Sequence, residues 1–363
     1  MPHRGWSRRE MLRMGGCITG GVLASAAASR IAPLAFAQGG AGQVIVRALG
    51  GAYEDAERRA IFDPFTKATG IKVVTVPATQ TQVLAMVRSG SVQLDVLDLG
   101  ESGTILLDRA QALAPIDYGK FKLTNPSDLN APIRRPNMVG NIYFATVLGY
   151  SATNFAKIHP RTWAEFWDVE RFPGPRSLEG IEAGDVPLEF ALLADGVPVE
   201  KLYPIDVDRA LHSLGRIKKS ILKWWTTGAE SAALLESGQA VAMDIWNGRI
   251  QGPIDKGAPL AIEWNQAMRL KQFWSIVRGA PNAGNALHFI DFALQPHVQA
   301  DLARYIPYGP TNKRAFRYVT KADAEKLVSS PQHFKVSFDE DAYWWADHLD
   351  AVAKRWQTWL LQG

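Results

Sequence analysis

The stretch VIVRALGGAYEDAERRAIFDPFTKATGIKVVTV, residues 44–76, decides the fold of this 363-residue chain. It begins with a short β-rich run at 44–49 that ends in two glycines, and residues 53–68 then place apolar side chains at helical spacing. A second β-branched run follows at 71–76. This pattern predicts strand, glycine turn, helix and strand, which in one sheet gives parallel strands covered by a helix.

The same alternation continues toward the C-terminus, because residues 81–88 have a helical pattern and residues 94–99 form a third β-rich run. The carboxyl ends of parallel strands open on a common crevice, so the loops 50–53 and 100–104 are expected to face one ligand. Glycine lets the backbone approach a ligand, and a helix N-terminus offers free amides to an anion, although glycine can equally serve tight turning alone. The loops supply four candidate ligand contacts: Gly51, Tyr53, Glu101 and Ser102.

The rest of the chain continues this α/β pattern. Further strands are predicted at 141–150, 241–246 and 272–277, and helices at 207–223, 231–236 and 286–294. A chain of this length exceeds the size at which a single hydrophobic core stops growing, so two lobes are expected. Their boundary is predicted near residues 149–152.

The N-terminus has the pattern of an export signal. Adjacent arginines at Arg8 and Arg9 precede a small, weakly apolar stretch at 14–29, and residues 35–37 read Ala-Phe-Ala. This predicts a twin-arginine signal peptide over residues 1–37, cleavage after Ala37 and a periplasmic protein. The alternative is a membrane anchor, but a bilayer-spanning helix needs about 20 apolar residues and this run is shorter.

Composition excludes several classes of function. The one cysteine, Cys17, belongs to the signal, so the mature chain is expected to have no disulfide, thiolate nucleophile or cysteine-bound metal. Removing the signal takes away five arginines and one glutamate, which leaves equal numbers of basic and acidic residues and no nucleic-acid footprint. The sequence has neither a Gly-X-Ser-X-Gly nor a His-Glu-X-X-His motif. We therefore expect no catalytic residues, metal or cofactor.

Several short motifs resemble those of the spermidine/putrescine-binding branch of the type II periplasmic binding proteins. They are GGAY at 50–53, FTKATGIKV at 65–73, IWNG at 245–248, FW at 273–274 and YGPTN at 308–312. The resemblance implies an α/β protein with two lobes, joined by crossing hinge strands, that close on a ligand in the cleft between them. It also implies a monomer whose partner is the membrane part of an ABC importer. The implied lobes are 40–149 with 276–306, and 150–275 with 307–363.

The same resemblance implies aromatic side chains around a cationic amine, because an ammonium over a ring gains about 0.5–2 kcal/mol. Trp246, Trp274 and Tyr308 match these positions, and Tyr53 would close the other side. Trp225 is preferred over its neighbour as a further contact, and Asn247 lies in the IWNG motif. The alternative for any tryptophan in this chain is packing in the core.

Two departures from the family pattern concern the ligand. Polyamine binders have an acid two residues after the tryptophan of the FW pair, where this chain has Ile276, and acids are not evident in the matching stretch 183–187. Arg249 instead offers a planar donor fork suited to a carboxylate. With Asp98, Glu101 or Asp244 as ammonium partner, it predicts an ω-amino acid or another small zwitterion, and a polyamine is the alternative. A solvated Arg249 and purely structural acids remain open.

The predicted function is capture of a small amine-containing solute for an ABC importer. Two alternatives are a ligand sensor that engages a receptor and a secreted hydrolase. Ferric-iron capture is disfavoured because the mature sequence has no adjacent tyrosine pair.

Overall fold

The computed structural model describes residues 42–48 and 50–362, and the structural statements below concern these residues. The predicted signal peptide and its cleavage site after Ala37 lie outside them. None of the described helices is both long and apolar enough to cross a membrane.

The N-terminal segment folds as its sequence predicts. β1 (Gln43–Arg47) pairs in parallel with β2 (Lys72–Val76) and with β3 (Val96–Gly100). Gly50 and Gly51 turn the chain from β1 into the first helix with φ angles of +77° and +72°, which glycine adopts without strain. The predicted β-α-β-α-β order is therefore confirmed. The helices of this segment are α1 (Gly51–Glu57), α2 (Asp63–Thr69), α3 (Gln80–Ser89) and α4 (Glu101–Arg109), and a π-helical turn (Arg58–Phe62) joins the first two.

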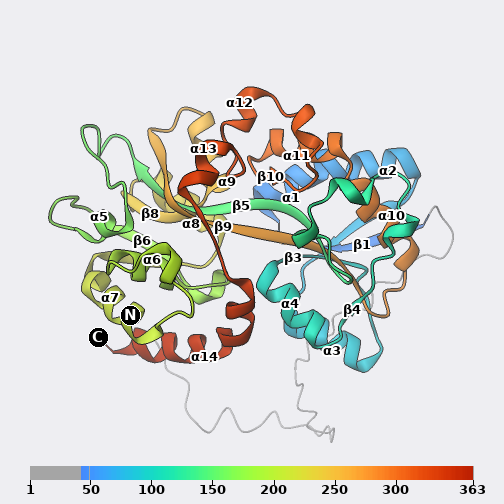
Figure 1. The fold of residues 1–363 in the computed structure, drawn as a ribbon, viewed down its shortest axis with the longest axis horizontal. Helices are drawn as coiled ribbons and strands as arrows, with labels where there is room; N and C mark the ends of the chain where they lie inside the picture. Colours follow the sequence, from blue (N-terminus) through green and yellow to red (C-terminus); the bar gives the residue numbers. More distant parts are fainter. Residues whose placement is uncertain (1–41, 49, 363) are drawn as a thin grey trace, which may run out of the picture. The chain divides into compact units, whose positions relative to one another are not determined.

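Two long antiparallel strands, β5 (Val139–Ser151) and β9 (Leu260–Val277), connect this segment with the rest of the chain. The sheet has the order β2-β1-β3-β9-β5-β8-β6-β7. Figure 1 shows β5 and β9 running through the middle, with β1 and β3 toward one end and β6 and β8 toward the other. The remaining strands are β4 (Leu113–Ala114), β6 (Arg176–Glu179), β7 (Ile221–Trp225), β8 (Ala242–Trp246), β10 (Gly309–Pro310) and β11 (Phe338–Asp339).

Buried hydrophobic side chains form three clusters along this sheet. We call the residues around the first cluster lobe 1; it contains α1–α4, α10 (Ala283–Ala293) and α11 (Pro296–Tyr305). We call the residues around the other two clusters lobe 2. Its helices are α5 (Trp163–Trp167), α6 (Leu188–Ala194), α7 (Val207–Ile217), α8 (Gly228–Glu236), α9 (Asn247–Asp255) and α14 (Ala342–Leu361), and the short α12 (Lys321–Ala324) and α13 (Pro331–Val336) precede α14.

Two predicted elements differ in the structure. The helix predicted over 207–223 ends at Ile217, and a 3-10 turn (Lys218–Ser220) then leads into β7. The strand predicted over 272–277 is the last third of β9. In both cases strand pairing decides: β7 pairs in parallel with β6 and buries Trp225, and β9 continues because β5 pairs along most of it.

A buried arginine fixes the start of β6. Arg176 is fully buried, and its guanidinium donates hydrogen bonds to the backbone oxygens of Phe166, Phe172 and Gly174. Because these carbonyls satisfy the buried charge, the loop before β6 is held to α5. The strand then carries Glu179, at its other end, to the cavity described next.

Candidate ligand-binding site

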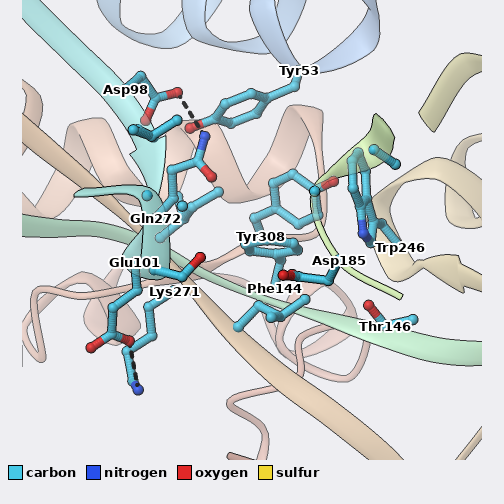
Figure 2. A pocket seen from close by; sticks show the side chains of 18 of the residues that line it. Tyr53, Asp98, Glu101, Phe144, Thr146, Asp185, Trp246, Lys271, Gln272 and Tyr308 are labelled. Atoms are coloured by element: carbon cyan, nitrogen blue, oxygen red, sulfur yellow. Dashed lines mark hydrogen bonds and ion pairs between the residues drawn. The ribbon is translucent and has the colours of Figure 1, made fainter. Parts of the chain in front are cut away.

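A cavity of about 240 Å³ lies between lobe 1 and lobe 2, and side chains from both line it (Figure 2). This volume lies below the range of about 300–1,000 Å³ that is usual for drug-sized ligands, so the cavity suits a small one. The lining includes Arg47, Tyr53, Glu57, Asp98, Glu101, Ser102, Phe144, Thr146, Glu179, Asp185, Trp246, Arg249, Lys271, Gln272, Tyr308 and Glu340.

Aromatic rings form a continuous part of this lining. Tyr308 lies edge-on to Tyr53, with ring centroids 5.6 Å apart, and 5.5 Å from Phe144. Phe144 in turn lies edge-on to Trp246 at 6.1 Å. The sequence placed Tyr53, Trp246 and Tyr308 at the cleft, and all three line the cavity. Phe144 was missed, because nothing in its local sequence separates it from the other apolar residues of β5.

Trp274 lies in the core of lobe 1 and not at the cavity. Its ring is fully buried and packs edge-on against Phe289, with centroids 5.4 Å apart. Gln272, two residues earlier on β9, lines the cavity. Trp274 is the next residue on the same face of the strand, so it lies about 7 Å further into lobe 1. Ile276 is deeper still and is also buried. The lack of an acid at position 276 therefore carries no information about the ligand.

Trp225 and Asn247 support the cavity from outside. Trp225 is fully buried and lies edge-on to Trp246 at 5.3 Å, so it packs against this cavity residue and does not line the cavity. The Asn247 side chain accepts a hydrogen bond from the Ala145 amide at 3.0 Å and donates one to the Pro307 carbonyl at 2.8 Å. It thereby ties the start of α9 to β5 and to the segment before Tyr308.

The three acids predicted as ammonium partners all have partners within the protein. Asp98 lines the cavity and accepts a hydrogen bond from Gln272 at 3.1 Å, and burial raises its pKa to about 6. Glu101 forms ion pairs with Arg135 and, at 3.1 Å, with Lys271 (Figure 2).

Asp244 does not line the cavity. It accepts a hydrogen bond from the Trp225 indole at 2.7 Å, and burial raises its pKa to about 7.

Other acids that the sequence did not single out face the cavity. One of them is Asp185, in the stretch 183–187 where the sequence analysis found no evident acid. Burial raises the pKa of Glu57, Glu179 and Glu340 well above the ordinary value, and that of Asp185 to about 6. Glu57 and Glu340 each retain one buried carboxylate oxygen without a hydrogen-bond partner in the described chain. No group of three or more histidine, cysteine, aspartate or glutamate side chains there has the geometry to hold a metal ion.

Arg249 enters the cavity from the first turn of α9, and two glycines leave space for it. A Cβ at Gly228 would lie 2.6 Å from its Nε, and a Cβ at Gly51 would lie 3.3 Å from its Nη1. Gly51, a predicted ligand contact, therefore lies against this guanidinium and is not itself part of the lining. The Nε atom is buried and has no hydrogen-bond partner among the described residues. The arginine that lines this cavity therefore has one N–H donor without an acceptor among the described residues.

A sequence profile of bacterial extracellular solute-binding proteins matches residues 60–332. The chain belongs to this family. This solute-binding protein is 33% identical over 338 residues to the gamma-aminobutyric acid-binding protein of Pseudomonas aeruginosa, covering 90% of this chain and 93% of that relative.

Solved structures of related proteins give the same fold. An ABC transporter substrate-binding protein from Bradyrhizobium japonicum USDA 110 matches with a TM-score of 0.82 and 34% identity, over 88% of this chain and 99% of the other. A periplasmic binding protein from Agrobacterium tumefaciens R10, in complex with agropinic acid, matches with a TM-score of 0.79, 34% identity and the same coverage. The predicted fold class, a type II periplasmic binding protein, is confirmed.

One further structure differs in its conformational state. A binding protein of A. tumefaciens C58 in an open unliganded conformation is 33% identical over 88% of this chain and 99% of its own, but its TM-score is 0.66. At nearly equal identity, this solute-binding protein therefore superposes better on the ligand complex than on the open form.

Proposed function

We propose that the protein is the substrate-binding component of an ABC importer and that its ligand is a small ω-amino acid, with γ-aminobutyrate as the simplest case. The observation that carries this proposal is Arg249, which lines the cavity and whose buried Nε has no hydrogen-bond partner in the described chain. A planar guanidinium matches the two oxygens of a carboxylate and binds them with charge-assisted hydrogen bonds.

The rest of the lining suits an ammonium group. The rings of Phe144, Trp246 and Tyr308 line the cavity and pack on one another, and several carboxyl groups line the same cavity. Rings with a nearby acid are a favourable setting for a desolvated ammonium. One end of the ligand would therefore be anionic and the other cationic. The gamma-aminobutyric acid-binding relative supports the same ligand class.

A polyamine fits this lining less well. Both of its ends are cationic, and one of them would meet Arg249 or Lys271 in a cavity of about 240 Å³. Like charges at close range inside a protein repel strongly, because the effective dielectric constant is low. We therefore place diamines second.

Lobe closure and export complete the proposal. The fit to a ligand-bound relative supports a closed form, in which both lobes contact the ligand and which the importer would recognise. The N-terminal signal would send the protein to the periplasm, with cleavage after Ala37 and function as a monomer.

Thermal unfolding with a ligand panel tests the proposal. A ligand that binds only the folded state stabilises it by about 2.7 kcal/mol at a hundredfold excess over Kd. We expect γ-aminobutyrate to raise the Tm of the mature protein clearly, and putrescine and butyrate, which each lack one of its two charges, to raise it much less. A larger shift with putrescine than with any ω-amino acid would contradict the proposal.

Trp246→Ala is expected to weaken γ-aminobutyrate binding about tenfold, because the variant loses one ring beside the ammonium. Isothermal titration calorimetry measures the change in Kd. The control is Trp359→Ala on α14, which removes a tryptophan that does not line the cavity. Equal Kd values for Trp246→Ala and the control would exclude Trp246 as a ligand contact.

A further inference from the structure

The first two turns of α14 contact lobe 1, although the rest of this helix packs in lobe 2. Ala342 and Ala346 lie one turn apart on the same face of the helix and are buried in the hydrophobic cluster of lobe 1. Trp345 is fully buried in a cluster of lobe 2, and its indole donates a hydrogen bond to Glu189 on α6 at 2.7 Å. One helix is therefore anchored in lobe 2 and also packs on lobe 1.

An ion pair joins this part of α14 to the last residue of α4. The Arg109 guanidinium donates a hydrogen bond to the Asp347 carboxylate at 2.5 Å, and both side chains are exposed. The first residue of α4, Glu101, lines the cavity, so the ion pair lies about 12 Å further along the helix. The contact between the lobes thus extends beyond the residues that line the cavity.

Tyr343 adds an aromatic contact to this ion pair. It lines a hollow whose other residues belong to lobe 1. The guanidinium carbon of Arg109 lies 6.0 Å from the centre of the Tyr343 ring, and that of Arg135 lies 5.3 Å from it. Arg135 also lies 4.9 Å from the ring of Phe273 on β9. Since a guanidinium is attracted to an aromatic ring, both arginines hold Tyr343 against lobe 1.

These contacts stop short of the ligand. Arg135 pairs with Glu101, which also pairs with Lys271 at 3.1 Å. Glu101 and Lys271 line the cavity, whereas Tyr343 and Asp347 do not. The start of α14 can therefore influence a ligand in the cavity through the arrangement of the lobes, without touching it.

The arrangement of the lobes decides whether these contacts exist. The chain superposes better on the ligand complex than on the open form described above. Trp345 anchors α14 in lobe 2, so the helix would move with that lobe. A rotation of lobe 2 about β5 and β9 would take Tyr343 and Asp347 away from the arginines of lobe 1.

We propose that the start of α14, residues 342–347, is a latch that closes on α4 once a ligand is bound and sets how long the ligand is retained. The inference rests on the lobe closure of the proposed function and assigns control of affinity to residues outside the cavity. The latch stabilises the closed complex and not the open form. Weakening it should therefore speed up dissociation, leave association nearly unchanged and affect different ligands by the same factor.

Stopped-flow tryptophan fluorescence measures both rates, because Trp246 lines the cavity. The ligands are γ-aminobutyrate and the longer δ-aminovalerate. Tyr343→Ala and Asp347→Arg are each expected to speed up dissociation about fivefold for both ligands, the size expected for exposed cation–π and ion-pair contacts. A charge swap that combines Arg109→Asp with Asp347→Arg restores the ion pair and should bring dissociation back toward the wild-type rate.

Asp350→Arg is the matched control, since it makes the same change of charge at an exposed position about one turn further along α14 and should leave both rates unchanged. Tyr343 and Asp347 are exposed too, so the Tm of the empty variants should equal that of the wild type.

Two results would overturn the latch and leave the proposed function standing. They are wild-type dissociation rates in both Tyr343→Ala and Asp347→Arg, and a charge swap that dissociates as fast as Asp347→Arg alone. If neither ω-amino acid binds, the proposed ligand is wrong, and the same rates measured with putrescine then test the latch.

Discussion

Arg249→Ala is expected to raise the Kd for γ-aminobutyrate by about thirtyfold or more, because truncating one partner of a buried charged pair costs about 2–5 kcal/mol. The carboxylate of the ligand would lose its planar donor and remain desolvated in the cavity. Arg249→Lys keeps the charge but not the planar, bidentate geometry, so its Kd should lie between those of the wild type and Arg249→Ala. Calorimetry with the three proteins measures the series.

The same substitution should not destabilise the empty protein. The Nε of Arg249 is buried without a partner in the described chain, and a buried unsatisfied donor costs stability. The Tm of Arg249→Ala without ligand is therefore expected to equal or exceed that of the wild type. Arg317→Ala removes an exposed arginine and serves as the control. Wild-type affinity in Arg249→Ala would exclude a carboxylate clamp at this position.

The fold was predictable where it depends on local pattern. Residues 44–76 carry their own strand, turn and helix signals, and β1, α1, α2 and β2 follow them closely. The secondary-structure predictions were wrong where pairing with a strand distant in sequence determines the conformation. The helical pattern was predicted to continue through 218–223, with a loop after it, but β6 pairs with residues 221–225 and makes them β7.

The site was predictable to a similar extent. Trp246 and Arg249 stand where β8 passes into α9, a junction that the parallel-sheet pattern already directs toward the crevice. Glu340 has no such local signal. It reaches the cavity because β11 pairs with β9, a contact between segments about 70 residues apart in sequence that no spacing rule reveals. The prediction for Trp274 was wrong for a different reason. Its motif marks the correct strand, but the sequence does not show how far along β9 the cavity ends.

Acidification should stabilise the empty protein. Burial raises the pKa of Asp98 and Asp185 to about 6 and that of Glu189 and Asp244 to about 7. An acid with a higher pKa in the folded protein than in the unfolded chain, where it is about 4, binds its proton more tightly when folded. Stability therefore increases as the pH falls through the folded-state values. We expect Tm to rise by about 5 °C or more between pH of about 7.5 and about 5.5.

One group opposes this increase in stability, and one variant tests the contribution of a single acid to it. Burial lowers the pKa of His333, so protonation of this side chain on acidification destabilises the folded protein. This effect comes from one group, whereas several acids act in the opposite direction. Asp98→Asn removes one of the raised acids and should flatten the pH dependence, whereas Asp55→Asn removes an exposed acid and should not. A Tm that falls steadily over the same pH range would show that the cavity acids are ionised at little cost. With γ-aminobutyrate bound, the gain on acidification should shrink, because the ammonium already stabilises the ionised carboxylates that the proton would otherwise neutralise.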